Sequence, residues 1–403
     1  MHKLPIFYFS IRRDEIIPEQ LKRLLSFEKA VGDVKCETGI PGLKIDFNAG
    51  VRVQVPAGNW HIRISDYDTG MIGFDMDISE QVIISAEKYY IHWMVEAFLN
   101  GEKVFEHVIN LNDKKIYIYM PNGILGDTVA VLPYVCKLKQ QYNAEVYLYP
   151  PDMFKDICQE YMPDIALKKE IPEDCYASFC LAVFEHPPYL MPDDSRHWPL
   201  YMSAGLVLGL HEVASEIRYY PTAERNISEP YVCIAVQASG IMKRWLYPNG
   251  WNMVVAALKE MGYRVLCIDA EPYYKEGSYE VKIPDGAEDF TGKIPLMERI
   301  NLLAYAEFFI GLGSGLSWLA NACNIPVILI SGFSLPIAEF ETPYRIYNQL
   351  VCHGCYNDLK VNWKDGCPYH AGTNREYECS KMISPLQVIE AVCRLLKNKN
   401  LDV

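Results

Sequence analysis

A change of hydrophobic period at Lys115 constrains the fold most strongly. Beyond this residue, short continuous apolar runs alternate with helical segments. Continuous runs are typical of strands buried on both faces, as in parallel sheets that helices cover on each side. The expected strands span residues 116–120, 145–149, 178–184, 231–237, 264–268, 308–310 and 327–330. The sequence therefore predicts an α/β protein.

Helices are expected between these strands, for example at residues 250–261, 295–307 and 315–322. A last helix is expected from Ser384-Pro385 to about Asn398, because serine caps a helix and proline suits its first position. The polar, turn-rich stretch 221–230 lies midway through this half of the chain. We interpret it as a linker between two Rossmann-like domains, residues 113–222 and 223–403.

Ahead of Lys115 the pattern has period two, as in Val51, Val53 and Val55. Such alternation indicates antiparallel strands with one buried face. We expect a small, barrel-like antiparallel β domain at residues 42–112. Residues 1–41 are expected to form a helical extension, with an amphipathic helix at 19–30.

The charge balance limits the partners. The chain carries 38 basic and 51 acidic residues, a net charge of −13. No overall positive field exists to hold nucleic acid or an anionic membrane, so any phosphate must be bound locally.

Two apolar stretches bear on localisation. The stretch 4–11 is too short for a signal peptide, and Arg12 and Arg13 follow it directly. The uncharged stretch 308–338 is long enough to cross a bilayer, but glycines, asparagines and a proline interrupt it. We expect no membrane span and a cytoplasmic location.

The first candidate site is the turn 122–128, which contains Gly126, Asp127 and Thr128. It follows the first α/β strand and precedes a helix, where open α/β sheets bind ligands. At a helix N-terminus the dipole favours an ionised Asp127, which could accept a proton. The alternative is that Asp127 only caps the helix.

The second candidate is the turn 310–318, which contains Gly313, Ser314, Gly315 and Ser317. Backbone N–H groups and serine hydroxyls at a helix N-terminus can cradle a diphosphate. The stretch is neither a Walker loop nor a full dinucleotide fingerprint. Alternatively, its glycines serve packing alone.

The third candidate is Lys243 in the segment 238–245, which follows the expected strand 231–237. A cation there could neutralise a leaving diphosphate. The alternative is that Lys243 and Arg244 are solvated surface charges.

The most specific pattern is a set of four cysteines, Cys352, Cys355, Cys367 and Cys379. Their spacing suits a closed, structural tetrahedral site for zinc or iron in a loop with little apolar material. His353 and His370 are rival ligands, and unmetallated thiols are the alternative. Other cysteines, such as Cys233, Cys267 and Cys323, are expected in the core.

Together these features resemble a known family. Two Rossmann-like domains, a Gly-Asp-Thr turn, a Lys-Arg-Trp motif and a late glycine–serine helix start are similar to heptosyltransferases of the GT-B fold. In lipopolysaccharide heptosyltransferases the late motif is Asp-Thr-Gly-x-x-His, whereas here it is Ser314-Gly315-Leu316-Ser317-Trp318. The serine version, the added β domain and the cysteine insert resemble the bacterial autotransporter heptosyltransferases, from about Gly42 onward.

The resemblance implies inverting transfer of heptose from an ADP-activated donor to serine or threonine hydroxyls of an autotransporter adhesin. It implies Asp127 as general base, Lys243 as diphosphate partner, and donor phosphates at Ser314, Gly315 and Ser317. It also implies iron in the cysteine insert, residues 352–379, and a large homo-oligomer, a dodecamer.

Two other functions stay open. One is transfer from a UDP- or GDP-linked hexose to a protein, since no residue identified here reads the base. The other is a noncatalytic scaffold that binds glycans and assembles through the β domain and the metal loop.

Overall fold

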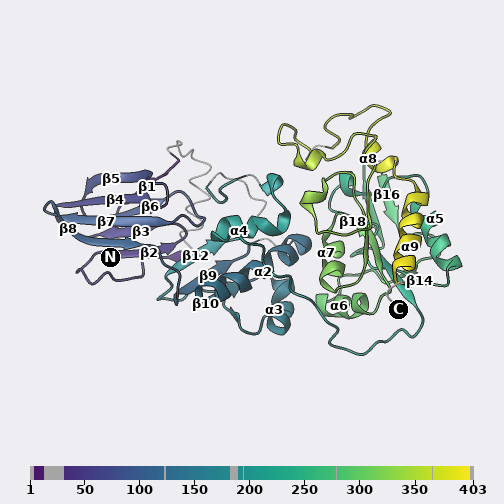
Figure 1. The fold of residues 1–403 in the computed structure, drawn as a ribbon, viewed down its shortest axis with the longest axis horizontal. Coiled ribbons are helices and arrows are strands. Elements are labelled where there is room, and N and C mark those ends of the chain that lie inside the picture. Colours follow the sequence, from purple (N-terminus) through teal and green to yellow (C-terminus); the bar gives the residue numbers. More distant parts are fainter. Residues whose placement is uncertain are drawn as a thin grey trace. The chain divides into compact units, whose positions relative to one another are not determined.

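The computed structural model describes residues 4–12, 31–121, 124–181, 189–193, 195–277, 279–364 and 366–399. The chain forms two compact units (Figure 1). Unit 1 comprises Met1–Gly123, Val131–Ser195 and Met202–Ser215, and unit 2 comprises Ile124–Ala130, Arg196–Tyr201 and Glu216–Val403. The helix expected at residues 19–30 lies outside the described residues.

The main sheet of unit 1 has eight strands in the order β1-β6-β3-β2-β12-β9-β10-β11. Its parallel part has the strands expected for a Rossmann-like domain. These strands are β9 (Lys115–Tyr119), β10 (Glu145–Tyr149), β11 (Ala166–Leu167) and β12 (Ala177–Cys180). The expected strand at 178–184 ends at Cys180, and residues 182–188 lie outside the described part.

The other half of this sheet belongs to the period-two region. Its strands are β1 (Ile6–Phe9), β2 (Lys44–Asn48), β3 (Arg52–Val55) and β6 (Gln81–Ser85). Strand β2 pairs in parallel with β12, with Phe47 opposite Ala177. The β region and the first Rossmann-like sheet are therefore continuous, which the sequence did not indicate.

The remaining strands form a separate antiparallel sheet in the order β5-β4-β7-β8. They are β4 (Trp60–Asp66), β5 (Ile72–Ile78), β7 (Trp93–Leu99) and β8 (Glu102–Val108). Trp60, Ile62 and Ile64 are buried while His61 and Arg63 between them are partly exposed, so the alternation is confirmed. The described strands lie in two open sheets and do not close into one barrel.

Unit 2 contains a parallel six-stranded sheet in the order β17-β14-β13-β18-β19-β20. The strands are β13 (Tyr231–Ile234), β14 (Arg264–Cys267), β17 (Glu288–Asp289), β18 (Phe309–Leu312), β19 (Val327–Ile330) and β20 (Arg345–Ile346). This arrangement confirms the predicted second Rossmann-like sheet.

Helices cover both faces of this sheet (Figure 1). Helices α6 (Leu296–Ala304) and α7 (Gly315–Ala322) lie on one side, and α5 (Gly250–Glu260) and α9 (Pro385–Lys399) on the other. The predicted cap of α9 is present, because the Gln387 N–H donates to Ser384 Oγ at 3.3 Å.

The helices of the first Rossmann-like region are α2 (Leu125–Tyr142), α3 (Lys155–Tyr161) and α4 (Ser203–Leu208). The first residues of α2 belong to unit 2 and the remainder to unit 1. A hairpin of β15 (Tyr273–Glu276) and β16 (Tyr279–Lys282) and the short helix α8 (Glu378–Lys381) complete unit 2.

Candidate functional site

The first turn of α2 packs against the start of α7 within unit 2. A Cβ built on Gly126 would lie 2.9 Å from Trp318 Cδ1 and 3.2 Å from Gly315 Cα. A Cβ on Gly315 would lie 2.9 Å from the Gly126 nitrogen. Neither position has room for a side chain, so the glycine pair brings the first two predicted turns together. Asn122 and Gly123 lie outside the described residues.

Asp127 is on this first turn. Burial raises its pKa from 3.8 to about 7, although the nearby positive charge of Lys243 lowers it. Desolvation raises this pKa more than the favourable charges lower it, so the carboxyl ionises less readily than its place at a helix N-terminus suggests. A carboxyl that titrates near neutral pH can accept a proton during a reaction.

Thr128 is buried, and its hydroxyl donates to the Ile124 carbonyl at 2.9 Å. This bond from residue 128 to residue 124 uses the hydroxyl proton within the first turn of α2. A role of Thr128 in substrate binding, which its place in the predicted ligand-binding turn implies, stays a prediction.

Lys243 ends a short 3₁₀ helix, Ile241–Lys243, and is partly buried. Arg244 beside it is buried, and its guanidinium lies 4.2 Å from the centre of the Tyr274 ring on β15. Arg244 also donates to the Ala238 carbonyl at 3.3 Å. Arg244 is therefore built into the fold and is not a solvated surface charge, whereas Lys243 is partly exposed.

Ser314 precedes α7 with an extended backbone, and its side chain makes no capping hydrogen bond. Its hydroxyl and the first N–H groups of α7 are thus suited to an anion. Ser317 differs, because it is fully buried and its hydroxyl donates to the Leu312 carbonyl at 2.5 Å. The Ser317 hydroxyl therefore holds the turn in this structure, and its contact with phosphate stays a prediction.

Gly313 packs against Glu339, which the sequence analysis missed. A Cβ on Gly313 would lie 2.2 Å from Glu339 Oε1. The only sequence signal for Glu339 is its place as the first charged residue after the uncharged stretch 308–338, which periodicity does not assign to a site.

Asp269, also missed, follows β14 and accepts N–H groups from Val236 at 2.8 Å and Gln237 at 3.1 Å. Burial raises its pKa despite these bonds. Its two hydrogen bonds fix the backbone of the segment that follows β13 and leads to Lys243.

The four predicted cysteine ligands come together. Cys355 and Cys379 are buried, while Cys352 and Cys367 are partly exposed. Burial first, and then the neighbouring Cys355, Cys367 and Cys352, raise the pKa of Cys379 to about 12. The thiols therefore lie near enough to affect one another's ionisation, and a metal bound by four thiolates would cross-link the loop and supply the charge that stabilises them.

One rival ligand set also has support. Ligand atoms of Cys352, His370 and Glu378 all lie within 4.8 Å of one another. Glu378 accepts the Cys352 N–H at 3.0 Å and two hydrogen bonds from Arg375, which lower its pKa to about 2. Because Glu378 is already engaged by these donors, we favour the four thiols. His353 bonds to the Val351 carbonyl through Nδ1 at 2.8 Å.

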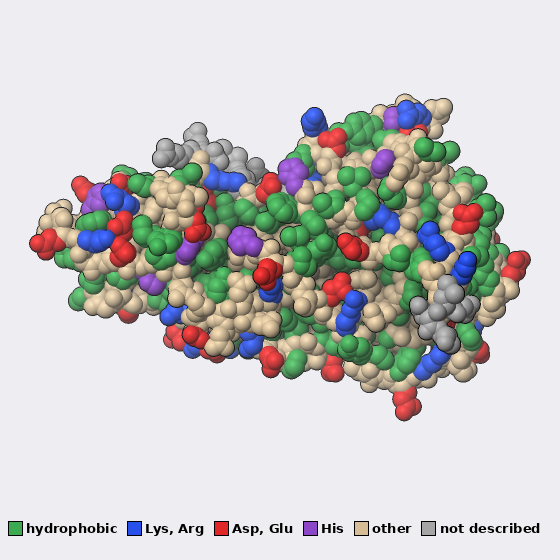
Figure 2. Space-filling view, viewed as in Figure 1, with side chains coloured by type: hydrophobic (Ala, Val, Ile, Leu, Met, Phe, Trp, Pro, Cys, Tyr) green, Lys and Arg blue, Asp and Glu red, His purple; other side chains and the backbone are tan. Residues whose placement is uncertain are grey.

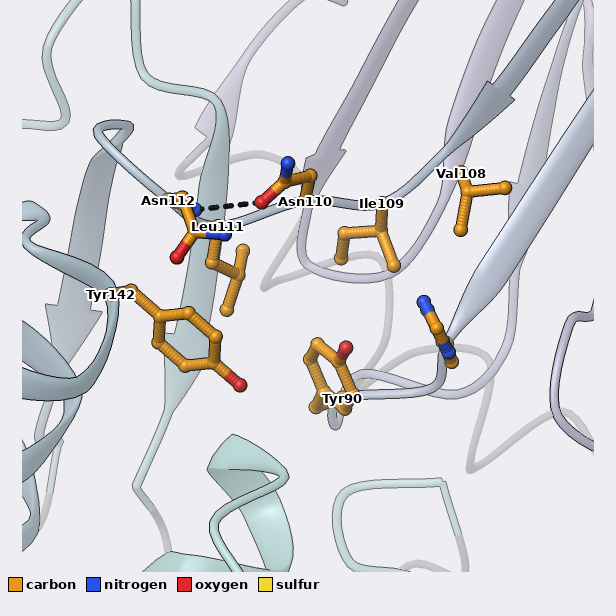
Figure 3. Close-up of a pocket in the computed structure, with 8 residues that line it drawn as sticks. Tyr90, Val108, Ile109, Asn110, Leu111, Asn112 and Tyr142 are labelled. Carbon is orange, nitrogen blue, oxygen red and sulfur yellow. Dashed lines mark hydrogen bonds between the residues drawn. The ribbon is translucent and has the colours of Figure 1, made fainter.

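An open pocket of about 380 Å³ lies in unit 1 (Figure 3). It is lined by Tyr90, His92, Val108, Ile109, Asn110, Leu111, Asn112 and Tyr142. The Tyr142 hydroxyl points toward Tyr90, and the Asn112 N–H donates to Asn110 Oδ1 at 3.0 Å. None of the predicted site residues lines this pocket, which the sequence gave no reason to expect.

Figure 2 shows acidic and basic side chains interspersed over the face in view, which agrees with local and not global recognition of phosphate. Among the described residues, no helix combines the length and the apolar character that crossing a bilayer requires.

Rossmann-like sheets followed by glycine turns, with an added N-terminal β region, define a glycosyltransferase of the GT-B class. The model for the N-terminal domain of glycosyltransferase TibC matches residues 39–101. The model for glycosyltransferase family 9 (heptosyltransferase) matches residues 206–355.

Individual relatives identify the family more specifically than these two domain models do. The autotransporter heptosyltransferase BAHTCr of Citrobacter rodentium is 39% identical over 384 residues, 93% of this chain and 94% of that protein. The autotransporter heptosyltransferase TibC of Escherichia coli is 38% identical over 373 residues, 90% of this chain and 92% of that protein. This chain belongs to the autotransporter heptosyltransferase family.

The fold agrees with a solved relative. The crystal structure of TibC from enterotoxigenic E. coli, described as an iron-containing dodecameric glycosyltransferase, has a TM-score of 0.85 and 37% identity. The match covers 91% of this chain and 99% of that chain. A second TibC structure contains ADP-D-beta-D-heptose.

Proposed function

We propose that this enzyme transfers heptose from an ADP-heptose donor to serine or threonine hydroxyls of an autotransporter adhesin, with inversion at the sugar carbon. The observation that carries the proposal is the half-buried Asp127 carboxyl, with a pKa raised to about 7, near Lys243 and the start of α7. Family membership and the ADP-heptose complex of TibC support the choice of donor.

Asp127 acts as the general base in this proposal. A serine or threonine hydroxyl has a pKa far above neutral, so its proton must be removed as the new bond forms. The hydroxyl oxygen bonds to the anomeric carbon from the face opposite the leaving group. The bond from that carbon to the diphosphate oxygen breaks, and the proton stays on Asp127.

Lys243 and the start of α7 receive the leaving ADP. The ammonium and the N–H groups near Ser314 and Gly315 neutralise charge that grows on the diphosphate as the bond breaks. No divalent metal is required at this position in the proposal. In this proposal the four cysteines of the finger, residues 352–379, would hold iron in a structural role; TibC is described as iron-containing.

Acceptor, assembly and location rest on the relatives. The names of the relatives point to an autotransporter as acceptor, and TibC is described as a dodecamer. We include both in the proposal, with the β region as an assembly surface. A cytoplasmic location would let the acceptor be modified before export.

Titration calorimetry with ADP, UDP and GDP in the presence of a chelator tests the donor assignment. We expect ADP to bind most tightly, and binding to be independent of magnesium. Tighter binding of UDP or GDP would instead favour the hexosyltransferase alternative. Glycan binding without any transfer or donor hydrolysis would favour the scaffold.

A further inference from the structure

The segment that follows β19, residues 331–335, contacts the metal finger (residues 352–379). Its Gly332 carbonyl accepts the Gly354 N–H at 3.0 Å, and its Phe333 carbonyl accepts the Tyr356 N–H at 3.1 Å. A Cβ on Gly332 would lie 2.2 Å from the Cys379 carbonyl oxygen. The backbone of this segment therefore rests directly on the turn and the helix that carry Cys355 and Cys379.

Side chains strengthen this contact. The Phe333 ring lies 5.7 Å from the Tyr356 ring and 5.4 Å from the Trp363 ring, centre to centre. The Leu335 N–H donates to Asn357 Oδ1 at 2.9 Å. The position of segment 331–335 thus depends on the order of the finger, which lies at one end of unit 2 with α8 (Figure 1).

The same segment holds a buried carboxylate. Ser331 and Ser334 donate their hydroxyls to Glu339 Oε1 at 3.0 and 2.7 Å. Arg345 pairs with the other oxygen of Glu339 and donates to the Ser334 carbonyl at 2.9 Å. The side chains of Glu339 and Arg345 are 7% and 8% exposed, so this pair is shielded and tightly held.

Glu339 in turn contacts the turn before α7. Oε1 occupies the space that a Gly313 side chain would need, because a Cβ there would lie 2.2 Å away. Gly313 is followed by Ser314, whose N–H closes a tight turn on the Leu312 carbonyl at 2.6 Å. Glu339 thus packs closely against the backbone of this turn, and we expect a displacement of its carboxylate to change that packing.

We propose that Glu339 is a positioning residue that couples the metal finger to the donor site. The inference rests on the proposed function, which assigns the donor diphosphate to the turn at Ser314 and Gly315. With metal bound, the finger fixes segment 331–335, the serines fix Glu339, and Glu339 fixes the turn. Loss of the metal removes the first constraint, so the turn is less well ordered for the diphosphate.

Coupling between two sites is reciprocal, which gives the test two independent readouts. In wild-type protein, removing the metal with a chelator should weaken ADP binding by at least about fivefold, the lower end of typical coupling. Saturating ADP should slow metal release to the same chelator. Calorimetry and a chromogenic chelator measure the two effects.

Two variants test the role of Glu339 itself. Glu339→Gln and the milder Ser334→Ala should keep the metal, weaken ADP binding, and raise KM for the donor more than they lower kcat. In both, metal removal should have little further effect on ADP affinity. If Glu339→Gln does not fold, Ser334→Ala carries the test, since it removes one hydroxyl only.

A matched control is Asp46→Asn in unit 1. Asp46 is a fully buried carboxylate paired with Arg52 at 2.6 Å, so its loss also disrupts a buried ion pair. We expect it to lower the melting temperature without changing ADP affinity or the effect of metal removal. A purely structural role for Glu339 would give this same pattern in its own variants and would overturn the proposal.

The failures are distinguishable. Metal-loaded wild type that does not bind ADP contradicts the proposed function. ADP binding that is equally tight with and without metal overturns the coupling and leaves the proposed function intact. If the metal-free protein unfolds, the metal-loaded variants Ser334→Ala and Glu339→Gln decide the test. ADP affinity equal to that of the wild type in both variants overturns the proposed coupling.

Discussion

Asp127 lies close enough to Lys243 for the ammonium charge to lower the pKa of the carboxyl, yet burial outweighs this effect and holds that pKa at about 7. The pair therefore has two opposing requirements. The base must be deprotonated to work, and the cation that favours deprotonation must also receive the leaving group.

The rate of transfer should depend on the ionisation of Asp127. A base acts only when deprotonated, so kcat/KM should rise with pH and level off above about pH 7. Asp127→Asn should abolish this rise with pH and lower the rate by about two to four orders of magnitude. Turnover of the variant within a few-fold of wild type would mean that Asp127 only stabilises the helix.

The Asp127 carboxyl should lower the stability of the protein as pH rises, whereas it raises the rate of transfer. Its folded pKa is raised, so stability falls as pH rises from about 4 to about 7, while the unfolded chain ionises and the folded chain does not. The penalty is at most about 4 kcal/mol above pH 7, from a shift of about three pKa units. Asp127→Asn should therefore be more stable than wild type at pH 8, and the gain should vanish near pH 4. Denaturant unfolding at both pH values measures this, and a gain independent of pH would contradict it.

Lys243→Ala should weaken ADP binding by about 1.5–3 kcal/mol, the range for hydrogen bonds to charged groups. The loss should be the same with magnesium and with chelator. Lys259→Ala, at an exposed position on α5, removes the same charge and serves as the control. Equal effects of the two variants would indicate a general loss of positive charge, not a diphosphate contact.

The finger should hold one metal per chain, iron in preference to zinc. Cys352→Ser and Cys367→Ser should lower metal content and stability together, because metal affinity is part of the folding free energy here. Elemental analysis of protein purified without added metal gives both results. Metal retained in Cys367→Ser but lost in His370→Ala would instead assign the site to Cys352, His370 and Glu378.

The local pattern of the sequence was sufficient for much of the fold. The expected helix at 315–322 matches α7, because a glycine turn and an apolar run define both of its ends. The pairing of β2 with β12 was not predictable in this way, since it joins residues far apart in the chain and leaves no periodic signal. A deletion of residues 1–111 would remove β2 and so expose the edge of β12, which makes it unsuitable as a test of assembly alone.

The candidate site, like the fold, was predictable where the sequence carries a local motif and not where it depends on tertiary packing. Gly126, Asp127, Lys243 and the cysteines stand in recognisable local motifs, whereas Glu339 matters only through its packing against Gly313. The hydrogen bonds of the Thr128 and Ser317 hydroxyls to backbone carbonyls of their own turns could not be predicted from the sequence either. Whether burial or the nearby charge controls the pKa of Asp127 also depends on tertiary structure.

Intact-mass analysis of an autotransporter adhesin co-expressed with this enzyme tests the central claim most directly. We predict mass increments of whole heptose units, which are absent when Asp127→Asn replaces the wild-type enzyme. Increments of hexose units, smaller by one CHOH group each, would contradict the donor. An unmodified adhesin beside folded, metal-loaded wild-type enzyme would contradict the transferase activity proposed for this chain.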